Sequence, residues 1–185
     1  MKIAILVGST RPGRKGSAVG HWIFEAARSR EDAEFELLEL EDFGLPLLDV
    51  PVDAGAAKRE YERESTRVWS RTVDGIDGFV WVTPEYNHGV PAAMKNAVDL
   101  LYPEWNQKVA GYVGYGFDGA TRAVEQWRSI LAAVVMFTTR AQVSLRNVGD
   151  WTDGEFTPGE RRGRELDRVL GQVVATTAAV RQLRD

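Results

Sequence analysis

Short stretches of apolar residues alternate along the chain with longer stretches in which apolar residues recur every three or four positions. Residues 3–7 and 79–82 are apolar throughout, a pattern typical of strands that are covered on both faces. Three further strands are predicted at residues 35–40, at residues 108–115 and within residues 134–145. Helical spacing of apolar positions predicts helices at residues 17–27, 54–73, 89–101, 120–133 and 157–183, the first capped by Ser17.

This regular alternation of strand and helix determines the expected fold class. It implies a parallel sheet with helices on both faces, and right-handed crossovers then restrict the topology. For five strands we predict a flavodoxin-like three-layer α/β sandwich with strand order 2-1-3-4-5. The 185 residues are the usual size of one domain and contain no repeat or convincing linker, so we expect a single domain over residues 1–185.

Composition excludes several classes of protein. The net charge of -4 gives no footprint for nucleic acid or for an anionic membrane surface. Cysteine is absent, which excludes disulfides and thiolate chemistry and fits a reducing cytosol. His21 and His88 are the only histidines, so we expect no metal site. The apolar start is too short for a signal peptide, and no apolar run approaches the roughly 20 residues of a membrane helix, so we expect a cytoplasmic protein.

Candidate chemistry lies in the loop after the first strand. In a sheet of this order, ligands bind beyond the carboxyl ends of the strands where the strand order reverses, between the first and third strands. Residues 8–17 combine glycines, hydroxyl groups and three basic side chains ahead of a helix N-terminus, which suits a phosphate monoester. The loop is not a Walker loop, because Arg14 and Lys15 stand where Lys-Ser/Thr is required. The alternative is an ordinary turn with solvated basic residues.

Two more loops are expected at the same edge of the sheet. In residues 83–89, Pro84 stiffens the chain, while Tyr86 offers a ring for packing and Asn87 offers hydrogen bonds to a flat polar heterocycle. Residues 114–120 place glycines beside aromatic residues, which permits close approach to a ring. Either loop is also compatible with a plain strand-to-helix connection.

Three motifs in this order resemble the NADPH-dependent FMN reductase family, which includes flavodoxin-like quinone, azo-dye and chromate reductases. Gly-Ser-Thr-Arg-Pro-Gly-Arg at residues 8–14 resembles the phosphate loop of the family, and Pro-Glu-Tyr-Asn at residues 84–87 resembles its flavin-ring loop. Residues 91–99 resemble its Pro-x-x-x-Lys-Asn-Ala-hydrophobic-Asp helix, in which Lys95 and Asn96 are expected to fix the helix against the flavin loop.

The resemblance implies a set of FMN-binding residues. Contacts to the FMN phosphate are expected from Ser9, Arg11, Arg14, Lys15, Gly16, Ser17 and Ala18. Contacts to the ring system, largely through the backbone, are expected from Pro84, Glu85, Tyr86, Asn87, Tyr115 and Gly116. Ala18 stands where the family often has Asn, so only its backbone N–H remains for the phosphate, and Arg14 and Lys15 are expected to compensate.

No acid–base pair or nucleophile stands out, so no catalytic side chain is expected. This fits an enzyme in which FMN carries the reaction and the protein positions it. The resemblance implies hydride transfer from NADPH or NADH through FMN to a quinone, an azo compound, a metal oxyanion or free flavin. It favours NADPH, although no sequence feature identifies a pocket for the 2′-phosphate.

Alternative functions and the mode of assembly stay open. The alternatives are a flavodoxin-type electron carrier, a phosphate-binding hydrolase and a non-catalytic flavin-binding module. Arg11 argues against the carrier, whose phosphate loop is uncharged, and the lack of a nucleophile argues against the hydrolase. Family resemblance implies a homodimer or homotetramer, for which Trp105, Trp127 and residues 45–48 are candidates for either interface or core.

Overall fold

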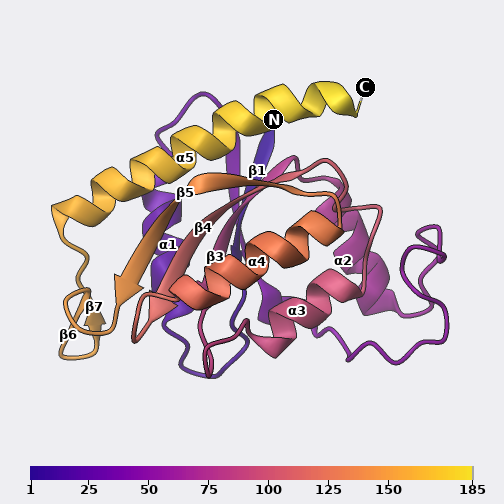
Figure 1. Ribbon diagram of the computed structural model, residues 1–185, viewed down its shortest axis with the longest axis horizontal. Coiled ribbons are helices and arrows are strands. Elements are labelled where there is room, and N and C mark those ends of the chain that lie inside the picture. Colours follow the sequence, from indigo (N-terminus) through magenta and orange to yellow (C-terminus); the bar gives the residue numbers. More distant parts are fainter. Residues whose placement is uncertain (185) are drawn as a thin grey trace.

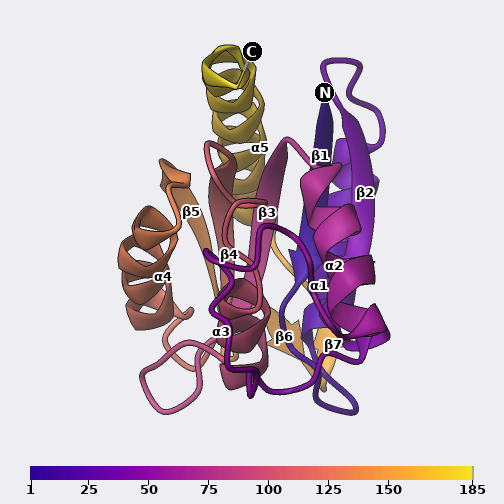
Figure 2. The same cartoon turned by 90° about the vertical axis from the view of Figure 1, so that its right-hand side faces the viewer.

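Five parallel strands form one sheet with helices against both of its faces (Figures 1 and 2). The computed structural model describes residues 1–184. The strands are β1 (Lys2–Val7), β2 (Glu34–Glu39), β3 (Gly78–Pro84), β4 (Val109–Gly116) and β5 (Phe137–Arg146). Their order across the sheet is β2-β1-β3-β4-β5 and all neighbouring pairs are parallel, which confirms the predicted flavodoxin-like topology.

The helices connect the strands as the alternating pattern predicts. They are α1 (Gly16–Ala27), α2 (Glu64–Asp74), α3 (Ala92–Asp99), α4 (Thr121–Ala133) and α5 (Glu160–Val180), with short 3-10 helices η1 (Leu40–Phe43) and η2 (Arg181–Leu183). A small antiparallel ribbon of β6 (Trp151–Thr152) and β7 (Glu155–Phe156) precedes α5, and the sequence pattern gives no signal for it. Each helix described among residues 1–184 is too short or too polar to cross a membrane.

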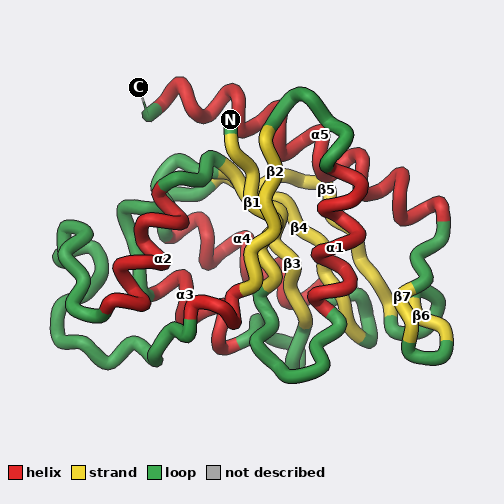
Figure 3. Tube along the Cα trace, turned by 180° about the vertical axis from the view of Figure 1, so that it is seen from behind, coloured by secondary structure: helices red, strands yellow, loops and turns green. Residues whose placement is uncertain are grey.

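Strand side chains alternate between two cores on opposite faces of the sheet. On one face, α1 and α5 cover residues such as Ile5 and Val82. On the other face, α2, α3 and α4 cover residues such as Leu6 and Trp81. Figure 3 shows the strands running between α1 on one side and α2 and α3 on the other. Burial on both faces explains why β1 and β3 are apolar throughout.

Four tryptophans pack against one another in the core under α2, α3 and α4. Trp81 lies at the centre, with its ring centroid 5.4 Å from that of Trp127 and 5.8 Å from that of Trp105. Trp69 in turn lies 5.8 Å from Trp105. All four side chains are fully buried, so Trp105 and Trp127 belong to the core and not to an exposed surface.

The prediction of a helix at residues 54–73 is wrong over its first half. The helix begins at Glu64, and residues 54–63 form turns and loop. Lys58 and Arg59 have φ angles of 50° and 66°, which a right-handed helix excludes. The buried positions that support α2 at helical spacing are Thr66, Trp69, Ser70 and Val73. Charged residues before Glu64 provide no comparable apolar stripe.

Other helix starts also differ from the sequence pattern. Ser17 does not cap α1, because the helix begins at Gly16 with Lys15 in the N-cap position and without a side-chain cap. The third helix begins at Ala92, because Gly89 closes a tight turn with Tyr86 and Pro91 is the extended N-cap residue. The first shift shortens the loop after β1 by one residue, and the second lengthens the loop after β3. The last helix begins at Glu160 and not at residue 157.

Candidate functional site

The loops after β1, β3 and β4 meet around a cavity of about 410 Å³, here called the site cavity. It is lined by Ser9, Arg11, Pro12, Gly13, Arg14, Lys15, Pro84, Glu85, Tyr86, Tyr115, Gly116, Phe117 and Asn147. Most of the residues expected to bind FMN are therefore brought together. Gly16, Ser17, Ala18 and Asn87 do not line the cavity, although Gly16 directly follows Lys15 and Asn87 directly follows Tyr86, which do.

Ser9 joins the first two loops across the point where the strand order reverses. Its hydroxyl oxygen lies 2.9 Å from that of Tyr86, and the Ser9 side chain is almost fully buried. The guanidinium of Arg11 lies over the Tyr86 ring, 5.6 Å from the ring centroid, within the range of a cation–π contact. Tyr86 therefore holds both an acceptor and a cation of the first loop in place.

The start of α1 provides backbone donors beside this contact. The N–H of Val19 bonds to the carbonyl of Lys15 at 3.3 Å, so the three N–H groups before it, at residues 16–18, have no acceptor within the helix. Such a cluster at a helix N-terminus suits an anion. Ala18 takes part through its backbone even though its side chain has no polar atom.

Tyr115 directs a buried hydroxyl at the same place. A Cβ atom at Gly16 would lie 2.6 Å from the Tyr115 Oη, so only glycine fits there. The Oη is buried without a hydrogen-bond partner among residues 1–184. Burial, helped by the nearby Tyr86, raises the pKa of Tyr115 above its usual value, so the hydroxyl stays protonated and able to donate. An orphan donor beside free backbone N–H groups fits a phosphate.

The basic residues that follow are already engaged. Arg14 donates to Glu39 at 3.0 Å and also pairs with Glu41, so two carboxylates compensate its charge. Lys15 donates to Asn147 at 3.1 Å and lies 4.8 Å above the centre of the Trp151 ring. Contacts from Arg14 and Lys15 to a phosphate stay predictions. Of the basic side chains in this loop, Arg11 forms a cation–π contact and has no carboxylate partner among the described residues.

The second loop ends in a two-residue turn. Tyr86 and Gly89 exchange backbone hydrogen bonds of 3.1 Å and 2.9 Å, and the turn residues Asn87 and His88 have φ angles of 49° and 65°. Asparagine tolerates this left-handed conformation, which fits its place in the motif. Gln126 of α4 holds the turn by donating to the carbonyl of His88 at 2.8 Å.

Glu85 fastens the second loop to α4. Its carboxylate accepts the backbone N–H groups of Arg122 at 3.0 Å and Ala123 at 3.1 Å, and the Arg122 guanidinium at 3.0 Å. At the start of the loop, the indole of Trp127 donates to the hydroxyl of Thr83 at 2.9 Å. Because its carboxylate caps a helix, Glu85 has only its backbone left for a ligand, in agreement with the expectation for this loop.

Four residues that line the site cavity are not among those expected to bind FMN: Pro12, Gly13, Phe117 and Asn147. Phe117 lines the cavity and its side chain is 81% exposed. Asn147 follows β5, and its N–H donates to the carbonyl of Gly116 at 2.9 Å. The glycine–aromatic pattern around Phe117 contains a signal for it. No local motif contains Asn147, whose position depends on the register that pairs Gly116 with Arg146.

Asn96 has a different structural role from the expected one. Its side-chain amide donates to the carbonyl of Pro46 and accepts the N–H of Leu48, both at 2.8 Å. Lys95 pairs with Asp99 one turn along α3. Asn96 therefore holds the loop after η1 against α3, and the flavin-loop contact expected for the pair is not formed.

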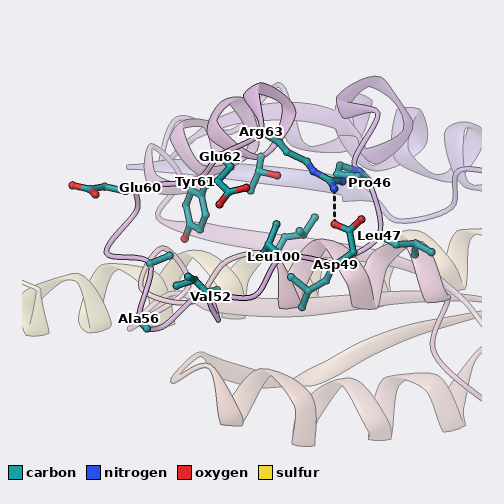
Figure 4. A pocket seen from close by; sticks show the side chains of 15 residues that line it. Pro46, Leu47, Asp49, Val52, Ala56, Glu60, Tyr61, Glu62, Arg63 and Leu100 are labelled. Atoms are coloured by element: carbon teal, nitrogen blue, oxygen red, sulfur yellow. Dashed lines mark hydrogen bonds and ion pairs between the residues drawn. The ribbon is translucent and has the colours of Figure 1, made fainter.

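A second cavity, of about 250 Å³, lies under that same loop (Figure 4). Its wall runs along residues 46–66 and includes Leu100, and an ion pair of 2.5 Å joins Arg63 to Asp49 across it. None of the residues expected to bind FMN lines this cavity. Among the described residues, no group of three or more His, Cys, Asp or Glu side chains is placed to hold a metal ion.

Comparisons with known proteins agree with this arrangement. The family model described as NADPH-dependent FMN reductase matches residues 1–150. The chain is 37% identical over 138 residues to NAD(P)H-dependent FMN reductase ntnL of Nectria sp, covering 72% of this chain and 69% of that protein. It is 34% identical over 146 residues to NAD(P)H-dependent FMN reductase LOT6 of Saccharomyces cerevisiae, covering 74% and 76%. The flavoenzyme NAD(P)H:(acceptor) oxidoreductase FerB of Paracoccus denitrificans shares the fold, with a TM-score of 0.72, 23% identity and coverage of 98% and 97%.

Proposed function

The chain belongs to the NADPH-dependent FMN reductase family, oxidoreductases that use FMN and NAD(P)H, and we propose that its site cavity binds FMN and passes electrons from NAD(P)H to a small acceptor. The acceptor classes are a quinone, an azo compound, a metal oxyanion or free flavin. When bound, FMN supplies the hydride chemistry, which fits a cavity without an acid–base pair.

The observation that carries this proposal is the Ser9–Tyr86 hydrogen bond. It brings the loop with free backbone N–H groups against the loop expected to hold the flavin ring. The phosphate would be held by the Ser9 and Tyr115 hydroxyls, the Arg11 guanidinium and the N–H groups of residues 16–18. These donors favour a charged terminal group by charge-assisted hydrogen bonds.

The ring system would lie along Pro84, Glu85, Tyr86 and Gly116, which line the rest of the cavity. Tyr115, expected at the ring, is assigned to the phosphate in this proposal because its hydroxyl lies beside Gly16. Three anchors from α4 fix this loop, through Glu85, His88 and Thr83. Fixed positioning of this kind is what the protein contributes to catalysis when the cofactor performs the reaction. Ser17, Ala18 and Asn87 remain in the proposal through their backbone groups.

A spectrum of the purified protein, followed by FMN titration, tests the binding step. We expect a flavin absorption spectrum and a protein that retains FMN. Steady-state oxidation of NADPH and NADH with a quinone then tests the reaction. A protein without affinity for FMN contradicts the proposal. A protein that binds FMN but is not reduced by either nicotinamide favours the flavodoxin-type carrier.

We propose further that residues 1–185 act as one FMN-binding domain in the cytoplasm. Absence of cysteine is compatible with that compartment. We also propose assembly into a homodimer or homotetramer. Leu47 and Val52, which are 75% and 49% exposed, supply apolar surface for such contact.

A further inference from the structure

A third cavity, of about 310 Å³, lies beside β5 and the first turns of α5, and is here called the arginine cavity. Its lining is entirely polar and consists of Gln142, Ser144, Arg146, Arg161, Arg162 and Glu165. β5 is the edge strand of the sheet, so no further strand covers it. Figure 1 shows the end of β5 and the start of α5 on the same side of the molecule as the β6–β7 ribbon.

Among the charged side chains around the arginine cavity, one arginine has no carboxylate partner within the described part of the chain. Arg162 donates to Asp150 at 2.9 Å and 3.0 Å and to Glu165 at 2.7 Å, and Arg161 donates to Glu165 at 2.8 Å. Arg146 is exposed, and its guanidinium has no hydrogen-bond or ion-pair partner among residues 1–184. Three guanidinium groups thus face two carboxylates, and Arg146 keeps its full set of donors for an incoming anion.

The backbone at Arg146 is nevertheless fixed. Its N–H donates to Asp150 at 2.7 Å, and Asp150 is itself buried and held by Arg162. Gln142 and Ser144, which project from the same strand, are joined by a hydrogen bond of 3.1 Å. The free guanidinium therefore extends from a rigid base, which lowers the entropy lost when it binds a ligand.

The arginine cavity adjoins the site cavity through two consecutive residues. Arg146 lines the first and Asn147 lines the second. The N–H of Asn147 donates to the carbonyl of Gly116, which places this junction at the rim of the site cavity. If the nicotinamide of a dinucleotide lies in the site cavity, its adenosine lies outside that cavity. The uncovered edge of β5 is a surface along which the adenosine can extend.

We propose that Arg146, with Arg161, binds the 2′-phosphate of NADPH in the arginine cavity. A phosphate monoester presents the paired oxygens that a guanidinium fork recognises. The 2′-phosphate is the group by which NADPH differs from NADH, so this contact would set the coenzyme preference. The inference rests on the proposed function, because it assumes that the nicotinamide enters the site cavity.

Calorimetry on the full-length, FMN-loaded protein tests this site without relying on turnover. We expect 2′,5′-ADP to bind more tightly than 5′-AMP. The double variant Arg146→Ala, Arg161→Ala should weaken 2′,5′-ADP binding about tenfold or more, as charge-assisted hydrogen bonds to the phosphate are lost. Binding of 5′-AMP and retention of FMN should not change. In steady-state assays the KM for NADPH should rise while that for NADH stays constant.

Arg164→Ala is the matched control, because Arg164 lies on α5 outside the cavity, pairs with Glu160 and is 67% exposed. Together with Arg168→Ala, at another exposed position of α5 outside the cavity, it changes the net charge by the same two units as the double variant and should leave 2′,5′-ADP binding unaltered. Equal affinities for 2′,5′-ADP and 5′-AMP, or equal losses in the control and the double variant, would overturn the inference. Arginine-dependent binding of 2′,5′-ADP by a protein that cannot oxidise NADPH would contradict the proposed function and leave this site standing.

Discussion

The hydroxyl oxygens of Ser9 and Tyr86 lie 2.9 Å apart and connect two loops that are 77 residues distant in sequence. Ser9 follows β1, which ends at Val7, and Tyr86 follows β3, which ends at Pro84. The contact therefore bridges the loops after β1 and β3, between which the strand order reverses. Ligands bind at this point in sheets of this kind.

Ser9→Ala together with Arg11→Ala should lower the affinity for FMN at least tenfold, because both remove a group proposed to bind the phosphate. Fluorescence titration with FMN measures the loss. Tyr86→Phe is the control, since it breaks the Ser9–Tyr86 hydrogen bond and leaves the Ser9 hydroxyl in place. The Tyr86→Phe variant should lose less FMN affinity than the double variant. An unchanged FMN affinity in the double variant would contradict the proposal that this loop binds the phosphate.

Gly16→Ala should abolish FMN retention and destabilise the fold. The added Cβ would lie 2.6 Å from the Tyr115 Oη and 3.0 Å from a Val7 methyl carbon, and overpacking of this kind costs about 1–3 kcal/mol. Thermal unfolding and FMN titration check both effects. Gly171→Ala, with open space at its Cβ inside α5, should keep FMN affinity. Adding Tyr115→Phe to Gly16→Ala should recover part of the stability, and no recovery would contradict the clash.

Glu85→Ala should loosen the second loop. The substitution removes the carboxylate that caps the N-terminus of α4 and that holds the loop against this helix. Loss of a helix cap costs about 1 kcal/mol, and FMN affinity should fall with it. Asp118→Ala is the comparison, since Asp118 also pairs with Arg122 at 2.9 Å but is not among the groups that cap α4. Urea unfolding with FMN titration separates the two variants. Equal effects would show that the ion pair matters and the cap does not.

Lys108 should make stability increase with pH. It is buried and donates to the carbonyls of Val73 and Asp74 at the end of α2, and burial lowers its pKa from 10.5 to about 8. Between these values the unfolded chain binds more protons than the folded one, so the free energy of unfolding rises from pH 8 towards pH 10.5.

Urea unfolding at several values from about pH 7.5 to about pH 9 checks this dependence, staying about one unit below the usual tyrosine pKa of about 10. Lys108→Met should flatten it. Lys58→Met, at an exposed position, should retain the slope of the parent. A slope that survives Lys108→Met would assign the titration to another group.

Local pattern predicts the strands, because an apolar run between turn residues depends only on neighbours in sequence. The strand order follows from general rules of connection. The start of α2 escapes prediction, since left-handed residues such as Lys58 and Arg59 carry no compositional signal of the kind that glycine gives. Their conformation depends on how the segment packs in the folded chain.

In the site, the first two loops are predictable from their glycines, hydroxyls and proline. Asn147 and Arg146 are not, because their positions follow from the pairing of β5 with β4, and a register cannot be read from either strand alone. Glu85 is predictable as a loop residue but not as the cap of α4, a contact between residues 37 and 38 positions apart in sequence.

Trp69, Trp81, Trp105 and Trp127 lie ring against ring on one face of the sheet, whereas Trp22 and Trp151 flank the other face. Neighbouring rings among the four lie 5.4–5.8 Å apart, close enough for excitation energy to pass from one to the next. Ultraviolet emission from this protein therefore reports chiefly on the layer formed by α2, α3 and α4. Trp151, near Lys15 and Tyr115, is the indole placed to sense events at the site cavity.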